Sequence, residues 1–147
     1  MGKYFTIEEL CKTSTKLENV PNELQKNNII RLIEVLDVIR EEWTIICNNN
    51  EWGNPAILVN SGFRSKIVND KVKGSKSSEH LLGFAVDFEP INGRNKEFWD
   101  FMVKWVKDNN IQFSQLINEK PINGVPSWIH FSINGYKGYR CEILTIE

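Results

Sequence analysis

The sequence predicts one α+β domain, with a mainly antiparallel sheet packed against a long N-terminal helix and a second amphipathic helix. Its 147 residues are enough for a single hydrophobic core and leave little room for a second one. Charged residues make up 25% and hydrophobic residues 41%, as in ordinary globular proteins. Helix-like and strand-like segments also follow one another without the regular alternation that builds a parallel sheet. We therefore expect a single domain over residues 1–147.

Helices are expected to dominate the N-terminal part of the chain. Thr6 and Glu9 have the spacing of a capping box, which predicts a short helix over residues 7–11. A polar loop is expected over residues 12–19. Apolar side chains then recur at helical spacing and predict a long amphipathic helix from about residue 22 to 47. These side chains belong to Ile29, Leu32, Ile33, Leu36, Ile39 and Trp43.

Two strands are expected in the middle of the chain, on either side of a polar connection. The segment 56–63 is apolar and β-branched and predicts a buried strand, with Arg64 at its end. Residues 65–79 are rich in lysine and serine and predict a mobile loop or a partly helical connection. Residues 84–90 alternate in polarity, which places Asp87 on the polar or site-facing side of a second strand.

The C-terminal part is expected to add one helix and three strands. Residues 95–110 carry apolar side chains at helical spacing, which assigns their aromatic residues to the core. The segments 113–119 and 128–133 predict two strands. An Asn-Gly pair at 134–135 predicts a turn into a final alternating strand, 139–146.

Charge and hydropathy argue against several classes of protein. The net charge of −1 gives no general reason to expect a nucleic-acid partner. No stretch reaches the roughly 20 apolar residues of a membrane span, and the opening MGKYFTIEEL lacks the features of an export signal. We therefore expect a protein made in the cytoplasm, monomeric and without membrane insertion. The three cysteines, Cys11, Cys47 and Cys141, show no CxxC spacing and are expected to be free and mostly buried.

The only two histidines of the chain, His80 and His130, are the strongest sign of chemistry. In the strand 128–133, His130 lies on the face opposite the apolar side chains. His80 precedes the strand of Asp87, and Gly83 between them permits the bend that would point both side chains to one spot. Two imidazoles and one carboxylate form a three-ligand set suited to catalytic zinc. For either histidine taken alone, a structural or surface position is the alternative.

The spacing of these residues adds a family resemblance. The pattern SxHxxGxAxD at 78–87, followed by WxH at 128–130, closely resembles the M15 family of zinc peptidases, which cleave peptides of the bacterial cell wall. SGFRS at 61–65 is similar to the family's strand end with its substrate-facing arginine, and FTIEELCKTST at 5–15 looks like the N-terminal region of a phage and bacterial subgroup. The resemblance implies that one zinc ion is bound by His80, Asp87 and His130.

Hydrolysis would also need groups that contact the substrate. Arg64 could stabilise developing negative charge or grip a substrate carboxylate, and a surface ion pair is the alternative for this residue. Ser78 is expected to form a hydrogen bond within the ligand loop or to contact substrate, and a plain turn-forming serine is the alternative. We also expect Trp128 to contact substrate.

The general base is the position where the sequence departs from the best-known family members, which carry an acid three residues before the second histidine. This chain has Ser127 there. We assign the role to Glu119, which would face the metal if its strand pairs antiparallel with the next one and places it opposite Trp128. A solvent-exposed acid is the alternative for Glu119, and Glu79 and Glu89 are competing carboxylates that look less well placed.

The leading hypothesis is a zinc metallopeptidase that cuts peptidoglycan stem peptides by means of a zinc-activated water. D-Ala-D-Ala carboxypeptidase and endolysin-type endopeptidase activities both stay open. One alternative is a non-catalytic zinc module that binds the cell wall or serves a structural role, since the related hedgehog signalling domain looks like such a case. A purely structural protein without metal is another. The resemblance to phage members suggests a lysin delivered by a holin or a virion, with a bacterial enzyme for released wall peptides as the alternative.

Overall fold

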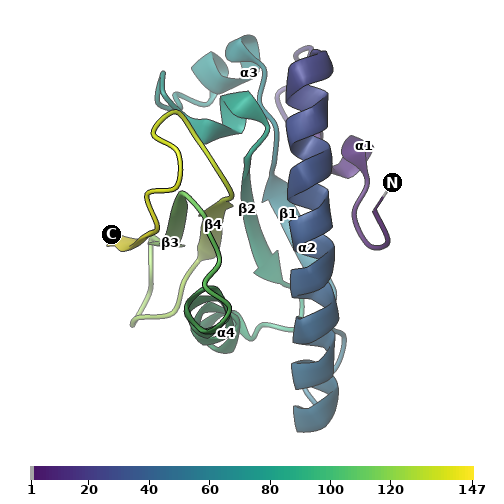
Figure 1. Cartoon of the computed structure of the whole chain (residues 1–147), viewed down its shortest axis with the longest axis vertical. Helices are drawn as coiled ribbons and strands as arrows, with labels where there is room; N and C mark the ends of the chain where they lie inside the picture. Colours follow the sequence, from purple (N-terminus) through teal and green to yellow (C-terminus); the bar gives the residue numbers. More distant parts are fainter. Residues whose placement is uncertain (1) are drawn as a thin grey trace.

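One sheet of five strands forms the centre of the computed structural model, which describes residues 2–147 (Figure 1). In spatial order the strands are β1 (Ile57–Ser61), β2 (Ala85–Pro90), β4 (Trp128–Ser132), β3 (Gln115–Glu119) and β5 (Glu142–Ile146). Neighbouring strands run antiparallel except for β3 and β5, which are parallel. The predicted α+β class with a mainly antiparallel sheet is therefore confirmed.

The last strand corrects the sequence prediction. The turn at 134–135 was expected to lead directly into a strand from residue 139, but β5 begins at Glu142 and does not pair with β4. Both edges of β4 are already occupied, by β2 and β3, and the chain passes to the outer edge of β3. Because β5 returns in the direction opposite to β4, it lies parallel to β3.

Besides the sheet, residues 2–147 form five helical segments. They are α1 (Ile7–Leu10), α2 (Glu23–Asn50), α3 (Lys66–Lys71), the short 3₁₀ helix η1 (Glu79–Leu82) and α4 (Asn95–Asp108). At the start of α2, Asn22 and Gln25 form a complete capping box. The helix continues three residues beyond its apolar pattern and ends at Glu51, which has a left-handed backbone. The connection predicted over residues 65–79 is indeed partly helical, because it contains α3 and the start of η1.

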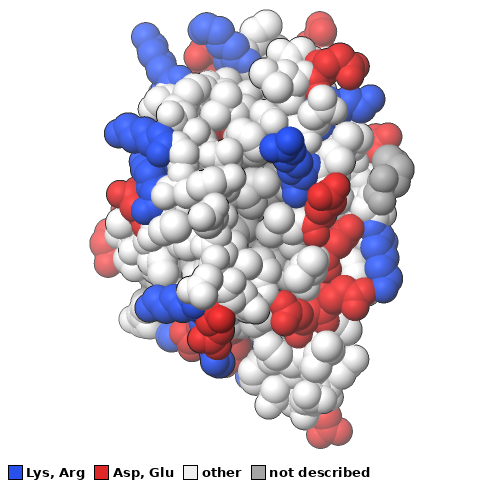
Figure 2. All heavy atoms as spheres, viewed as in Figure 1, with Lys and Arg blue, Asp and Glu red and all other residues white. Residues whose placement is uncertain are grey.

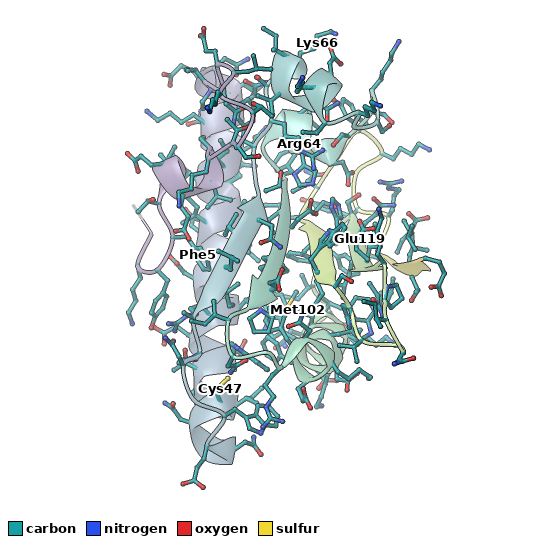
Figure 3. The ribbon with its side chains drawn as sticks, turned by 180° about the vertical axis from the view of Figure 1, so that it is seen from behind. Phe5, Cys47, Arg64, Lys66, Met102 and Glu119 are labelled. Carbon is teal, nitrogen blue, oxygen red and sulfur yellow. The ribbon has the colours of Figure 1, made fainter. Side chains whose placement is uncertain are left out.

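The hydrophobic core lies between the sheet and the two long helices, α2 and α4. The apolar side chains that the periodicity assigned to these helices are buried, and the rings of Trp43 and Phe98 meet edge to face at 5.0 Å. Met102 points from α4 toward the sheet, and Phe5, from the N-terminal segment, is buried in the same core (Figure 3). The opposite face of the sheet is left free for polar side chains.

The exposure of the cysteines was predicted only in part. All three cysteines are free, as predicted, but only Cys47 is buried, whereas Cys141 is exposed next to the edge strand β5.

Among the helices of residues 2–147, none combines the length and apolar character needed to cross a membrane. On the face shown in Figure 2, basic and acidic side chains of the described residues are interspersed, and neither sign covers it.

Gly83 occupies the bend that the sequence analysis required between η1 and β2. Its φ angle is +87°, and a Cβ atom there would lie 2.8 Å from the carbonyl oxygen of Gln25 and 3.0 Å from a side-chain carbon of Ile29. Both atoms belong to α2. The bend that leads into the strand of Asp87 therefore needs a glycine both for its backbone angle and for its close contact with the helix.

Replacing Gly83 by alanine is expected to destabilise the fold more than the same change at Gly93, which has a φ of +78° and no atom within 4 Å of its Cβ position. Gly93→Ala should cost about 1–2 kcal/mol for the left-handed backbone alone. Gly83→Ala should cost about 1–3 kcal/mol more, because the methyl group enters packed space. Urea unfolding of both metal-free variants measures the difference, and equal values would contradict the packing argument.

Candidate metal centre

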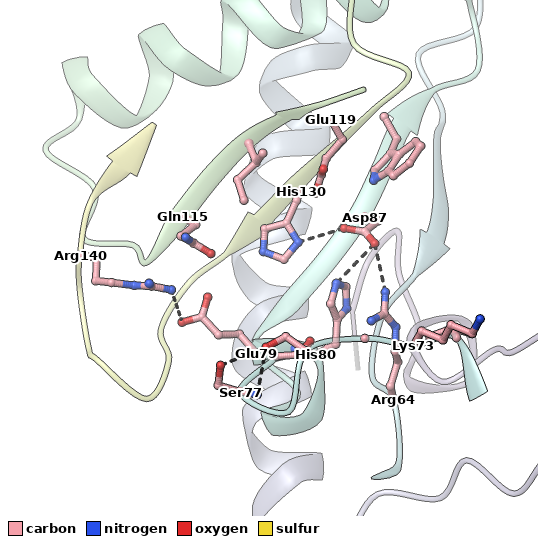
Figure 4. A pocket seen from close by; sticks show the side chains of 16 residues that line it. Arg64, Lys73, Ser77, Glu79, His80, Asp87, Gln115, Glu119, His130 and Arg140 are labelled. Atoms are coloured by element: carbon pink, nitrogen blue, oxygen red, sulfur yellow. Dashed lines mark hydrogen bonds and ion pairs between the residues drawn. The ribbon is translucent and has the colours of Figure 1, made fainter. Parts of the chain in front are cut away.

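Strand alternation places one set of side chains on the sheet face that points away from α2 and α4. From β2, β3 and β4 these side chains are Asp87, Gln115, Ile117, Glu119, Trp128 and His130. They line one wall of a cavity of about 610 Å³. The other wall comes from Arg64 and from the segment that leads into η1, including Lys73, Ser77 and Ser78 (Figure 4). The volume of the cavity is typical of a ligand-binding pocket.

The structure brings His80, Asp87 and His130 together at the floor of this cavity. One donor atom from each lies within 4.8 Å of the others. Nδ1 of His130 is 3.0 Å from one oxygen of Asp87, and Nε2 of His80 is 3.4 Å from the other (Figure 4). Asp87 and His130 are direct partners in the β2–β4 pairing, so the sheet register sets this part of the geometry.

His80 is oriented by a backbone group from another segment. Its Nδ1 lies 2.7 Å from the carbonyl oxygen of Gly62, which can only accept a hydrogen bond. His80 therefore carries its proton on Nδ1 and turns Nε2 toward Asp87 and the cavity. In histidines that bind a metal through one ring nitrogen, such a hydrogen bond from the other nitrogen fixes the tautomer and the ring orientation.

Burial and pairing set the protonation of the cluster. Burial lowers the pKa of the His80 imidazole, although the charge of Asp87 opposes this effect. Burial would raise the pKa of Asp87, but the charges and hydrogen bonds of His80 and His130 outweigh it and hold that pKa well below the ordinary value of 3.8. A neutral imidazole and an ionised carboxylate are the forms that bind metal ions.

Arg64 lies beside the cluster and is held from three sides. Its guanidinium donates to Asp87 at 3.4 Å, to Asn69 at 3.2 Å and to Ser61 at 3.1 Å. Its backbone nitrogen also donates to the carbonyl oxygen of His80 at 3.1 Å. Burial lowers the pKa of Arg64 while Asp87 raises it, but a guanidinium keeps its charge in proteins. The side chain is thus fixed in the cavity wall and is not a surface ion pair.

Glu119 has the register that the sequence analysis required. It is the direct partner of Trp128 across β3 and β4, and it lines the same cavity as His130. Burial, and then the nearby charge of Asp87, raise the pKa of Glu119 above the ordinary value of 4.5. Ser127, at the position of the usual acid, instead donates its hydroxyl proton to the carbonyl oxygen of Lys120 at 2.6 Å. Glu119 is therefore the carboxylate that faces the cluster from β3.

The remaining predicted residues have distinct positions. Ser78 caps η1, with its hydroxyl accepting a hydrogen bond from the His80 backbone at 3.2 Å, and it lines the cavity, as does the half-buried Trp128. Glu89 does not line the cavity and accepts a hydrogen bond from Asn60 at 2.7 Å. Ser78 thus forms a hydrogen bond within its own loop, while its contact with substrate stays a prediction, and Glu89 lies outside the cavity.

Some groups in the cavity wall were missed by sequence reasoning. Arg140 and Gln115 line the cavity, and Arg140 pairs with the buried Glu79 at 3.3 Å (Figure 4). These residues come from segments far apart in the chain. No local sequence motif indicates the ion pair between Arg140 and Glu79, which depends on the path of the chain from β4 to β5.

The donor set fits a divalent metal ion. Two imidazole nitrogens and one carboxylate oxygen converge from separate elements, and an open cavity lies above them. Zinc in catalytic sites takes such a set of three protein ligands and keeps a further position for water or substrate. Fold and site together define a candidate metal-dependent hydrolase.

The comparison with protein families agrees with this class. A family model described as peptidase M15 matches residues 3–119, most of the 147-residue chain, and the chain belongs to this family. The resemblance inferred from the motifs is thus confirmed. Members of the family are metal-dependent peptidases, which supports a hydrolase with a peptide substrate. The match includes His80 and Asp87 but ends before His130, which only the fold brings to the site. A search of curated proteins gave no significant match.

Proposed function

We propose that this protein is a zinc metallopeptidase that hydrolyses peptide bonds in the stem peptides of bacterial peptidoglycan. The observation that carries the proposal is the convergence of His80, Asp87 and His130 below a cavity that also contains Glu119. Membership of the peptidase M15 family supports the peptide substrate. The cell-wall substrate follows from the resemblance of the SxHxxGxAxD segment to peptidases that act on such peptides.

In this proposal the three clustered side chains hold one zinc ion. A bound zinc ion lowers the pKa of its water toward about 7 and polarises a carbonyl group. Asp87 supplies the negative charge of the ligand set, and the Gly62 carbonyl keeps the free nitrogen of His80 turned toward the site. The two imidazoles and the carboxylate leave the cavity side open to a peptide.

Glu119 acts as the general base in the proposed reaction. Its carboxylate accepts a proton from the attacking water and returns it to the amine of the departing peptide fragment, so that one water is consumed and one peptide bond is broken. The Arg64 guanidinium donates hydrogen bonds to the oxyanion of the tetrahedral intermediate or to a carboxylate of the substrate. Trp128 and Ser78, which both line the cavity, contact the peptide. The cut bond is that of a D-Ala-D-Ala carboxypeptidase or of an endopeptidase.

A non-catalytic zinc module that binds the cell wall is the second candidate. It is favoured by Ser127, which stands where the best-known peptidases carry an acid. In that case zinc would bind and the wall would be retained by the protein without release of fragments. The two candidates therefore differ in turnover and not in metal binding.

Mass spectrometry of fragments released from purified peptidoglycan tests the proposal. The protein loaded with zinc is compared with His80→Ala, on walls of more than one peptide chemistry. We expect new termini only with the intact protein, and their masses identify the bond. An absence of products on every wall, despite bound zinc, would favour the binding module.

Replacing Arg64 by glutamine is expected to lower kcat/KM for the released bond by about 10²- to 10³-fold, the loss that follows removal of an oxyanion donor. Arg94→Gln is the matched control, because Arg94 also forms an ion pair, with Glu97 at 3.7 Å, but does not line the cavity. Steady-state kinetics with a stem-peptide substrate, together with the zinc content of each variant, give the answer. A full rate in Arg64→Gln would remove Arg64 from the reaction.

A further inference from the structure

Glu79 is a buried carboxylate that the proposed reaction leaves without a role. It directly precedes His80 in η1, and its side chain is only 4% exposed. Burying an ionised carboxylate is costly unless several donors surround it. The arrangement of those donors therefore indicates what the residue does.

Four contacts enclose the Glu79 carboxylate, and each comes from the C-terminal part of the chain. The hydroxyl groups of Ser114 and Ser132 donate to it at 2.6 Å and 2.7 Å, and Arg140 donates at 3.3 Å. Gly135 packs closely against the same group, since a Cβ atom at this position would lie 1.5 Å from a carboxylate oxygen of Glu79. Arg140 also donates to the Ser114 hydroxyl at 3.2 Å. Two short hydrogen bonds from hydroxyl groups, one longer bond from a guanidinium and the backbone of Gly135 therefore enclose the carboxylate.

These contacts connect the two elements that carry the histidines. Glu79 is the neighbour of His80 in η1, and Ser132 lies two residues after His130 in β4. The backbone carbonyl groups of this turn bond mainly to other segments: that of His80 accepts from Arg64, and those of Leu81 and Leu82 accept from side chains of α2. Just after the turn, the carbonyl of Phe84 accepts from Ile133, at the end of β4. The Glu79 side chain thus links the turn with His80 to the strand with His130.

We propose that Glu79 is a positioning residue of the metal centre, which sets the separation of the two histidines by clamping η1 to β3 and β4. The proposal rests on the metal site of the proposed function but not on its catalysis. Groups behind the ligands of a metal site tune its affinity when they fix ligand orientation. The family match covers Glu79 and Ser114, whereas Arg140 and Ser132 lie beyond residue 119 and outside it.

The test is zinc affinity, measured by competition with a chromophoric chelator, and the visible absorption spectrum of the cobalt(II)-loaded protein. In Glu79→Gln we expect zinc affinity to fall by about 10- to 100-fold and the cobalt spectrum to change, because the ligand geometry relaxes. Glu89→Gln is the matched control, a glutamate two residues from Asp87 that does not line the cavity. It should keep both the affinity and the spectrum.

Circular dichroism of the metal-free variants separates positioning from folding. If Glu79→Gln does not fold, Arg140→Gln and Ser132→Ala weaken the same clamp from its other side and should show the same two effects in smaller measure. Wild-type affinity and spectrum in folded Glu79→Gln, or in both partner variants, would overturn the proposal. If the wild-type protein binds neither zinc nor cobalt, the metal site itself fails, and the proposed function fails with it.

Discussion

Glu119→Gln is expected to lower kcat/KM for peptide hydrolysis by about 10²- to 10⁴-fold, the usual contribution of a positioned general base. Glutamine has nearly the same shape but cannot accept the proton of the attacking water. The zinc content should stay at the wild-type level, because Glu119 is not one of the three clustered donors. Steady-state kinetics and metal analysis on the same preparation measure both quantities.

The pH dependence gives an independent check on this assignment. A base must be ionised, so kcat/KM of the wild type should fall as the pH drops through the pKa of Glu119, which burial raises above 4.5. A carboxylate with a raised pKa in the folded state stabilises the fold only at low pH, and this contribution is lost as the pH rises through that pKa. Glu119→Gln should therefore not be less stable than the wild type at neutral pH. A full hydrolytic rate in this variant with zinc retained would reject Glu119 as the base.

His130→Ala is expected to abolish both zinc binding and hydrolysis. At a free zinc concentration 100 times the dissociation constant, the wild type should gain about 2.7 kcal/mol of unfolding free energy, and His130→Ala should gain none at the same concentration. The variant removes one of three donors and one of the two histidine partners of Asp87. Urea unfolding with and without zinc measures the gain.

Trp128→Phe is the matched control for this prediction. It lies on the same strand and lines the same cavity as His130, but it offers no metal donor. This variant should keep the zinc-dependent gain in stability even if substrate binding weakens. An equal gain in His130→Ala would show that His130 is not a ligand.

Much of the fold was predictable because its signals are local. The helical spacing of apolar residues in α2 and α4 and the alternation in β2 and β4 each reflect one element packed against one core. The end of α2 was missed by three residues, since the polar residues 48–50 continue the helix beyond the apolar pattern. The parallel pairing of β5 was missed because it depends on which strand edges remain free.

The candidate site divides in the same way. His80, Asp87 and His130 could be selected from the sequence, since the chain has only two histidines and strand alternation assigns the faces of Asp87 and His130. The sheet face on which Glu119 lies depends on the register of β3 and β4, which the sequence alone does not determine. In the structure Glu119 pairs with Trp128, as the assignment requires. The hydrogen bonds to Glu79 could not be predicted from the sequence, because only the path of the C-terminal segments brings Ser114, Ser132 and Arg140 to its carboxylate.

The β2–β4 pairing also has a kinetic consequence. It joins Asp87 to His130 across 43 residues, and His80 is 50 residues from the same partner. Contacts over such separations close large loops, which costs conformational entropy and slows folding. An ion that binds only once this junction is complete would stabilise the native state and not the folding transition state. Its main effect would then be to lengthen the lifetime of the native state, with little change in the rate at which the chain folds.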